Sequence, residues 1–118
     1  MRNELLRIFA NWEIELKENE WYFSDCYEEL TKELSSSDAF AAILDVIDVL
    51  LLIKEAYLLN ETLEFLGIIY NIADTTEIHP MLLVQWENIT RHIQWFGDSY
   101  SYSAWKDIQY MVRIAELP

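Results

Sequence analysis

The fold is decided by the stretch SDAFAAILDVIDVLLLIKEAYLL, residues 37–59. With about 3.6 residues to a turn, its Phe, Ile, Val and Leu side chains fill one face of a helix and spread well beyond it. Ser37 stands before the run as an N-cap, and Asp38 suits the positive first turn. Only one side of this helix stays polar, so we expect a helix over 37–59 at the centre of a bundle.

Similar periodic patterns on both sides of this stretch predict further helices. Their apolar side chains recur at steps of three and four residues, over residues 3–17, 25–34, 61–73, 80–96 and from about 103 onward. Asn60 either caps the helix over 61–73 or bends one long helix that starts at residue 37. The helix that starts near 103 shows Trp105, Ile108, Val112 and Ala115 on one face.

The composition supports a purely helical chain. Two glycines and two prolines are too few for the regular turns of a sandwich or barrel, and 118 residues suit one domain. We therefore expect an all-α fold, a single domain over residues 1–118, built as a bundle of five or six helices. Three successive helix pairs leave a helical-hairpin repeat open as the arrangement.

Acidic residues far outnumber basic ones. The chain holds 21 Asp and Glu against eight Lys and Arg, a net charge of −13. Residues 39–90 carry eight acids and a single base, Lys54, whereas residues 91–118 are balanced with three of each. DNA and anionic membranes would repel such a surface. We therefore expect a basic protein partner, and neither nucleic acid nor a membrane.

Four acids of the central helix fall within an arc of about 100° at the helical period, and we call them the acidic stripe: Asp38, Asp45, Asp48 and Glu55. Two interpretations stay open. A nearly buried helix needs one solvated edge, which acids provide, or the stripe is an electrostatic face for the basic partner. Glu61 and Glu64 would extend that face onto the next helix.

The aromatic residues divide into two groups. Trp12, Trp86 and Trp105 recur on regular apolar faces and are predicted to lie in the core. Four others are predicted to lie in loops, where large aromatic side chains are typical of interfaces, and they are candidates for binding the partner: Trp21, Tyr22, Tyr100 and Tyr102.

The sequence contains no catalytic or metal-binding motif that we recognise. His79 and His92 are 13 residues apart and belong to no His-Glu-x-x-His pair or Cys/His cluster. Cys26 is the single cysteine and cannot form an internal disulfide. Gly67 and Gly97 stand alone, so no phosphate-binding loop is formed. We expect no catalytic residues, no metal and no cofactor.

The sequence also predicts a cytoplasmic protein. The first residues lack the basic and apolar regions of a signal peptide. The longest apolar stretch, residues 39–53, is interrupted by Asp45 and Asp48, so it is too short and too charged to span a bilayer.

In its small size, helical pattern, net charge of −13 and acidic stripe, the chain resembles the immunity proteins of bacterial contact-dependent and other polymorphic-toxin systems. The resemblance covers the whole chain through composition, and no family motif transfers a role to any residue. It implies a protein that binds a cognate toxin domain, often a basic nuclease, and blocks it by steric and electrostatic occlusion. A helical adaptor or homodimeric scaffold with residues 91–118 as its interface is the main alternative, and a small enzyme is the third.

Overall fold

A computed structural model of the chain describes residues 1–112. Every regular element in this range is an α-helix, which confirms the all-α prediction. The helices are α1 (Arg2–Ala10), α2 (Trp12–Glu18), α3 (Tyr22–Thr31), α4 (Ser36–Leu52), α5 (Ala56–Ala73), α6 (Pro80–Val84), α7 (Trp86–Phe96) and α8 (Ser99–Met111). These residues therefore form eight helices, and the predicted number of five or six is wrong. Ala115 lies outside the described residues.

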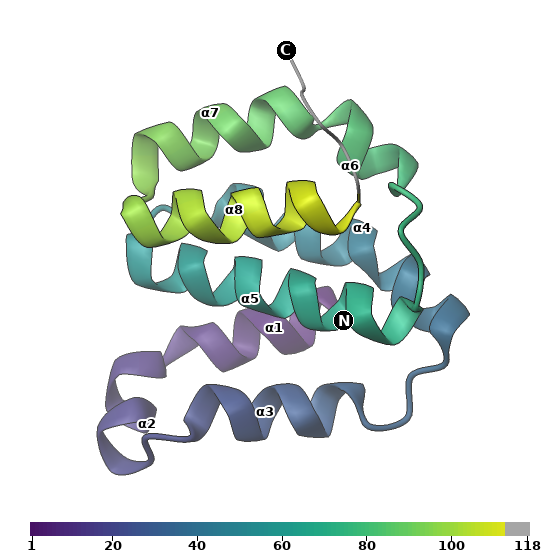
Figure 1. Cartoon of the computed structure of the whole chain (residues 1–118). Helices are drawn as coiled ribbons and strands as arrows, with labels where there is room; N and C mark the ends of the chain where they lie inside the picture. Colours follow the sequence, from purple (N-terminus) through teal and green to yellow (C-terminus); the bar gives the residue numbers. More distant parts are fainter. Residues whose placement is uncertain (113–118) are drawn as a thin grey trace.

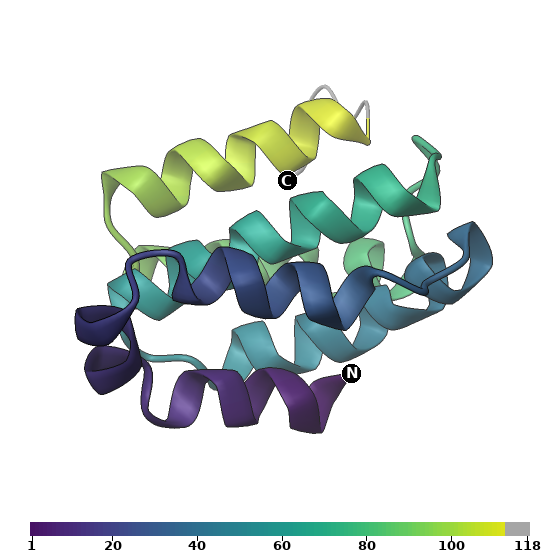
Figure 2. The ribbon, with the colours of Figure 1, turned by 90° about the horizontal axis from the view of Figure 1, so that it is seen from below.

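The helices stack as antiparallel pairs in chain order (Figure 1). The pair α4–α5 lies in the middle, α1 and α3 lie on one side of it, and α7 and α8 lie on the other. Helices α1, α4 and α7 run in one direction, and α3, α5 and α8 run in the opposite direction. Seen from below, α8 and α1 form opposite edges of the molecule (Figure 2). Helix α5 consequently has α3 and α8 as its two flanking neighbours.

The core is centred on α4 and α5, as the wide apolar arc of residues 37–59 predicts. Ile43, Ile47 and Leu50 of α4 are buried together with Leu63 and Leu66 of α5. Burying each such side chain stabilises the fold by about 1.5–3 kcal/mol. Trp86 and Trp105 are also buried, as predicted, whereas Trp12 is half-buried. No helix within residues 1–112 is long and apolar enough to cross a membrane.

The predicted helix over 37–59 is interrupted, which changes the position of Glu55. Helix α4 ends at Leu52, and Glu55 adopts extended backbone angles as the N-cap of α5. At the interruption, the Nε2 of His92 donates a hydrogen bond to the backbone carbonyl of Ile53. In an uninterrupted helix that carbonyl would accept from the backbone N–H four residues later. Glu55 therefore does not share a helix face with the other acids of the stripe. Asn60 lies inside α5 and does not cap it.

Two further predicted helices are each divided by one residue with non-helical backbone angles. Asn11 (φ −125°, ψ 33°) separates α1 from α2, and Gln85 (φ −91°, ψ 2°) separates α6 from α7. After Asn11 the chain turns so that the ring of Trp12 stacks on Tyr57. The periodic pattern continues across both breaks, which is why the sequence predicted single helices over 3–17 and 80–96.

Several helix ends also differ from the prediction. Helix α3 begins at Tyr22 and not at Asp25, and α4 is capped by Ser35 and not by Ser37. Residues 99–102, predicted as a loop, form the first turn of α8. A capping box stabilises this turn, in which the Asp98 carboxylate accepts from the backbone N–H of Ser101 and the Ser101 hydroxyl oxygen accepts from the backbone N–H of Asp98.

Candidate protein-binding groove

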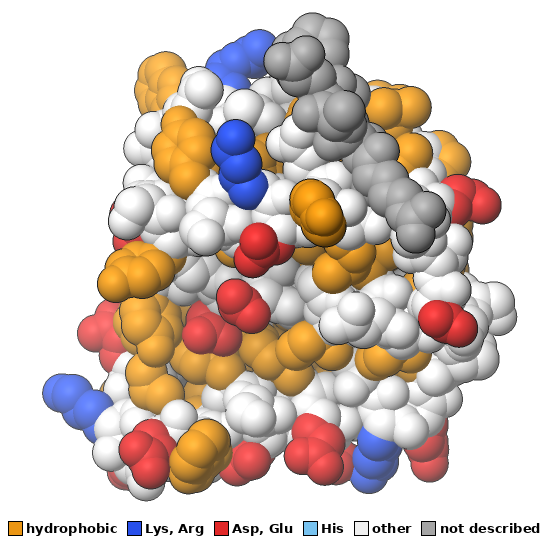
Figure 3. Space-filling model, viewed as in Figure 1, with side chains coloured by type: hydrophobic (Ala, Val, Ile, Leu, Met, Phe, Trp, Pro, Cys, Tyr) orange, Lys and Arg blue, Asp and Glu red, His pale blue; other side chains and the backbone are white. Residues whose placement is uncertain are grey.

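A groove of about 870 Å³ opens between α3 and α5, with the end of α2 and the start of α8 at its borders. We call it the α3–α5 groove. In Figure 3 an apolar band crosses this face between α3 and α5, with acidic side chains on both sides of the band. The large side chains that line the groove are Leu16, Phe23, Tyr27, Tyr57, Ile68 and Tyr100.

The charged residues that line the groove are all acidic: Glu20, Glu61, Glu64 and Asp98. In the described part of the chain, no Lys, Arg or His lines it. Within residues 1–112, no ion pair joins any of these four carboxylates to a basic group. The groove therefore presents negative charge beside apolar walls, which is a surface that favours the cationic side chains of another molecule.

Glu61 is the half-buried carboxylate of the groove, and its partner is Tyr27. The hydroxyl of Tyr27 lies 3.2 Å from the Oε1 and 3.3 Å from the backbone oxygen of Glu61. Burial raises the pKa of Glu61, and the nearby Glu64 raises it further, while the hydrogen bond from Tyr27 opposes both. Burial likewise raises the pKa of Tyr27, which keeps this phenol a hydrogen-bond donor. A cation brought close to Glu61 would stabilise its charged form.

Asp98 has a different environment, because it is held at the start of α8. Its carboxylate accepts from the backbone N–H groups of Tyr100 and Ser101 and from the side-chain amide of Asn60. These hydrogen bonds, the one from the Ser101 backbone first, lower the pKa of Asp98. The buried hydroxyl of Ser101 also donates to Asn60. This network fixes the start of α8 against α5 and so sets one border of the groove.

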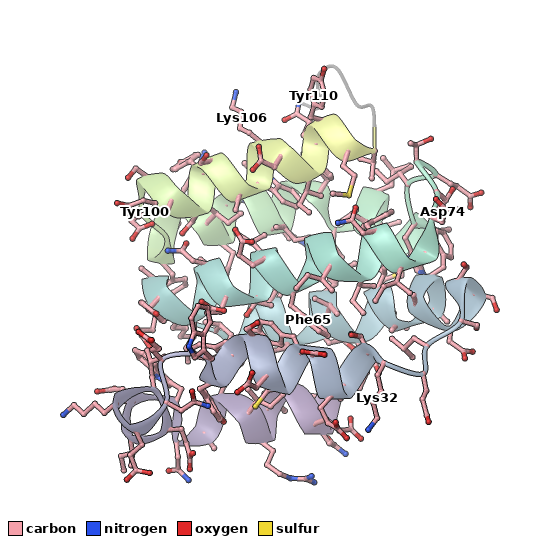
Figure 4. The ribbon with its side chains drawn as sticks, turned by 60° about the horizontal axis from the view of Figure 1, so that its bottom comes forward. Lys32, Phe65, Asp74, Tyr100, Lys106 and Tyr110 are labelled. Carbon is pink, nitrogen blue, oxygen red and sulfur yellow. The ribbon has the colours of Figure 1, made fainter. Side chains whose placement is uncertain are left out.

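Tyr57 stands at the opposite border, supported by α2. Its ring stacks on Trp12 with centroids 4.7 Å apart and an angle of 10° between the planes, and Tyr57 remains 44% exposed. Tyr100 on α8 is 74% exposed, at the end of α8 that is labelled in Figure 4. Two exposed phenol rings from separate helices thus stand at the groove, and rings of this type are common anchors in interfaces.

The structure separates the predicted acidic residues. Glu61 and Glu64 line the groove, whereas Asp38, Asp45 and Asp48 lie on α4. Asp38 and Asp48 are exposed, and Asp45 accepts a hydrogen bond from the backbone N–H of Arg2 at 3.3 Å. The α-amino group of Met1 lies 3.7 Å from the same carboxylate. The carboxylate of Asp45 is therefore partly used inside the chain, and the four-residue acidic stripe does not form.

The four predicted aromatic residues are also divided. Tyr100 alone lines the groove, and both it and Tyr102 belong to α8, so their prediction as loop residues is wrong. Trp21, the N-cap of α3, is 64% exposed. Tyr22 is half-buried in α3, and its hydroxyl donates to the backbone carbonyl of Ile8 at 2.6 Å. Tyr22 thus joins α3 to α1.

Sequence reasoning missed three residues that shape the groove, namely Glu20, Tyr57 and Asp98. A signal for one of them was available. Tyr57, Glu61, Glu64 and Ile68 follow one another at steps of four, three and four residues, which is the spacing of one helix face. The pattern becomes visible only when α5 begins at residue 56, whereas the prediction placed the helix boundary near residue 60.

No protein-family model, curated protein or solved structure matches the chain.

The residues considered for catalysis have structural partners. His92 donates to the Ile53 carbonyl, and the Nδ1 of His79 accepts from the backbone N–H of Met81 at 3.0 Å. Cys26 is half-buried, and burial raises the pKa of its thiol, which disfavours the nucleophilic thiolate. Within residues 1–112, no three His, Cys, Asp or Glu side chains gather closely enough to hold a metal ion.

Proposed function

We propose that this protein binds and neutralises a basic protein partner, as an immunity protein neutralises a nuclease-type toxin domain. The observation that carries the proposal is the α3–α5 groove, whose charged lining residues are four acids and whose walls are apolar. Lys and Arg combine an apolar stem with a cationic head, so both parts of such a side chain would find a complementary surface. The net charge of −13 adds long-range attraction during association.

Neutralisation follows from what a nuclease needs. Its active surface must hold phosphates with basic side chains. A groove that engages those same side chains with carboxylates would occupy the position of the nucleic acid, both sterically and electrostatically. Such a protein needs no catalytic residue, no metal and no cofactor of its own, and it would act in the cytoplasm, where it meets the toxin.

The groove, and not α4, is the surface that we assign to the partner. Helix α4 lies behind α5 in the view of Figure 1, and its exposed acids Asp38 and Asp48 do not line the groove. The assigned contact residues are Glu61, Glu64 and Tyr100, together with Glu20 and Tyr57. The α4 acids then serve as an internal control for effects of net charge alone.

The test looks for a basic nuclease domain encoded directly upstream of this chain and measures the nuclease activity of that upstream domain with and without this protein. We expect inhibition at a one-to-one ratio and association that slows steeply as salt rises. Replacing Glu61 and Glu64 by Gln should slow association and weaken inhibition. The matched double change Asp38→Asn with Asp48→Asn removes the same charge from α4 and should have a much smaller effect. Full nuclease activity in the presence of excess protein would contradict the proposal.

A homodimeric scaffold is the second candidate, and the exposed aromatic residues after residue 90 favour it. Trp95 is 76% exposed and Tyr110 is 86% exposed, and large exposed aromatic side chains are enriched in interfaces. This candidate requires a dimer at micromolar concentration. Sedimentation velocity decides it, since a monomer over that range removes the scaffold and leaves the neutralising protein.

A further inference from the structure

Two more hollows adjoin the α3–α5 groove along α5. One of about 200 Å³ lies between α5 and α8 and shares Glu64 and Ile68 with the groove. Another of about 480 Å³ lies at the C-terminal end of α5 and shares Asn71 and Met111 with the previous hollow. Together the three hollows follow α5 from residue 56 to residue 74, which is about 27 Å at about 1.5 Å per residue. We call this series the α5 trough.

The negative charge continues along the whole trough. Asp107 of α8 lines the second hollow and Asp74, the C-cap of α5, lines the third. Among residues 1–112, no Lys, Arg or His lines any of the three hollows. Lys106, although it is next to Asp107 in the chain, points away from α5 (Figure 4). The acids of the trough are Glu20, Glu61, Glu64, Asp74, Asp98 and Asp107.

Apolar side chains run along the trough between these acids. The α3–α5 groove contributes Phe23 and Tyr57, Ile68 lies where the first two hollows meet, and Met111 lies where the second and third meet. Apolar side chains therefore line the first two hollows and reach the third, whose lining residues other than Met111 are mainly polar, and acids line all three hollows. Its complement is a segment with an apolar face and cationic residues along both edges of that face.

We infer that the α5 trough takes one amphipathic basic helix of the partner, about 18 residues long. This inference rests on the proposed function and specifies the partner's shape. About five turns of helix span about 27 Å, with apolar residues at i, i+4 and i+7 facing the trough and Lys or Arg beside them. An extended segment of the same span holds only about eight residues, half of which point away. The few side chains of an extended segment that face the trough could not pair with acids that are distributed over its whole length.

The experiment uses the full chain and three labelled peptides of about 18 residues, the helical length of the trough, with binding followed by fluorescence anisotropy. The first is an amphipathic helix of Leu and Lys with Leu at the helical period. The second has the same composition in an order without an apolar face, and the third is an all-Lys peptide. We expect the amphipathic peptide to bind roughly tenfold more tightly than either control, which corresponds to about 1.4 kcal/mol.

Variants then locate the peptide. The double variant Glu64→Gln with Asp107→Asn removes two charges at the middle hollow. It should weaken binding of the amphipathic peptide roughly tenfold, as expected for two charges that pair with the peptide. The matched Asp38→Asn with Asp48→Asn on α4 should change binding less than about twofold. NMR chemical shifts should change at Tyr57, Ile68, Asn71 and Met111, which follow the trough from one end to the other.

Three outcomes would overturn the inference. Equal binding of all three peptides would mean that charge alone acts, and shifts confined to the α3–α5 groove would mean that the contact is short. Self-association that the peptide reverses would assign the trough to a second copy of this chain. A different result would reject the proposed function. If the peptide fills the trough but the upstream domain stays active in the presence of this protein, only neutralisation is rejected. If this protein inhibits that domain but no NMR chemical shift changes beyond the α3–α5 groove, only the elongated helix is rejected.

Discussion

The hydroxyl of Tyr27 on α3 donates a hydrogen bond to the carboxylate of Glu61 on α5, 3.2 Å away, across the base of the groove. Burial makes the charged form of Glu61 unfavourable in the folded protein, and its pKa is raised. Protonation of Glu61 therefore favours the folded state. The free energy of unfolding rises as pH falls from neutral through the range in which this carboxyl takes up its proton. At neutral pH a charged Glu61 costs stability.

Replacing Glu61 by Gln should therefore stabilise the isolated protein at pH 7 and weaken partner binding. Gln keeps an acceptor for Tyr27 and removes the poorly solvated charge, so the urea midpoint should rise. The gain should shrink as pH falls, because the wild-type carboxyl becomes protonated. Opposite changes in stability and binding are the trade-off expected of a functional residue.

Glu64→Gln is the control for this prediction, since Glu64 is exposed on the same helix. Its free energy of unfolding should stay within about 0.5 kcal/mol of the wild-type value. A Glu61→Gln variant that is less stable than the wild type at pH 7 would mean that the carboxylate has a folding role which the Tyr27 contact does not explain.

His79 should make the protein less stable in mild acid. Its Nδ1 accepts the Met81 backbone N–H at the start of α6, and burial lowers its pKa from 6.5, with Glu77 opposing the shift. Because the folded pKa is the lower one, stability is complete above about pH 6.5 and is lost as pH falls through the folded pKa. Protonation also removes the acceptor that caps the helix.

The variant His79→Asn tests this, because Asn caps a helix and does not titrate. Urea unfolding of both proteins is measured at several pH values between about 7.5 and about 5. In the difference between their free energies of unfolding, the contributions of all other titrating groups cancel. The free energy of unfolding of the variant should rise relative to that of the wild type as pH falls. Parallel pH profiles would show that His79 has no part in the acid sensitivity.

The two glycines should respond in opposite ways to substitution by Ala. A Cβ on Gly97, between α7 and α8, would lie 2.7 Å from the Ile93 carbonyl oxygen and 2.7 Å from the Ser101 hydroxyl oxygen. Gly97→Ala should therefore cost about 2–3 kcal/mol by disturbing the capping box. A Cβ on Gly67, inside α5, would meet only Ile108 Cδ1, at 3.9 Å. Gly67→Ala should stabilise by about 0.5–1 kcal/mol. Thermal unfolding of both variants measures the contrast.

His92 should maintain the break between α4 and α5. Replacing His92 by Leu leaves the Ile53 carbonyl without its donor, at a cost of about 1–3 kcal/mol for a buried acceptor. His92→Gln retains a donor and should recover part of this loss. Amide hydrogen exchange around residues 53–57 should accelerate in the Leu variant, and unchanged exchange would show that the break is intrinsic to the local sequence.

Local patterns were sufficient to predict the helical class, the buried centre and the core positions of Trp86 and Trp105. Periodicity decides these features because an apolar face must be buried wherever the helix is placed. The same patterns failed at the helix boundaries. At the break after Leu52, the Ile53 carbonyl is paired with His92, 39 residues away along the chain. Beside the division at residue 11, Trp12 stacks on Tyr57 of a distant helix.

The acidic character of the surface was likewise determined by the sequence, since 21 acids cannot be balanced by eight bases. Which acids act together was decided only by the tertiary structure. Asp45 accepts a hydrogen bond from the backbone N–H of Arg2, and Glu55 lies outside α4 as the N-cap of α5. Glu61 accepts a hydrogen bond from Tyr27, which is 34 positions away in the chain. A helix wheel gives the angle of a side chain about its own axis. It does not say which neighbouring helix stands opposite, because the packing of the whole core determines that.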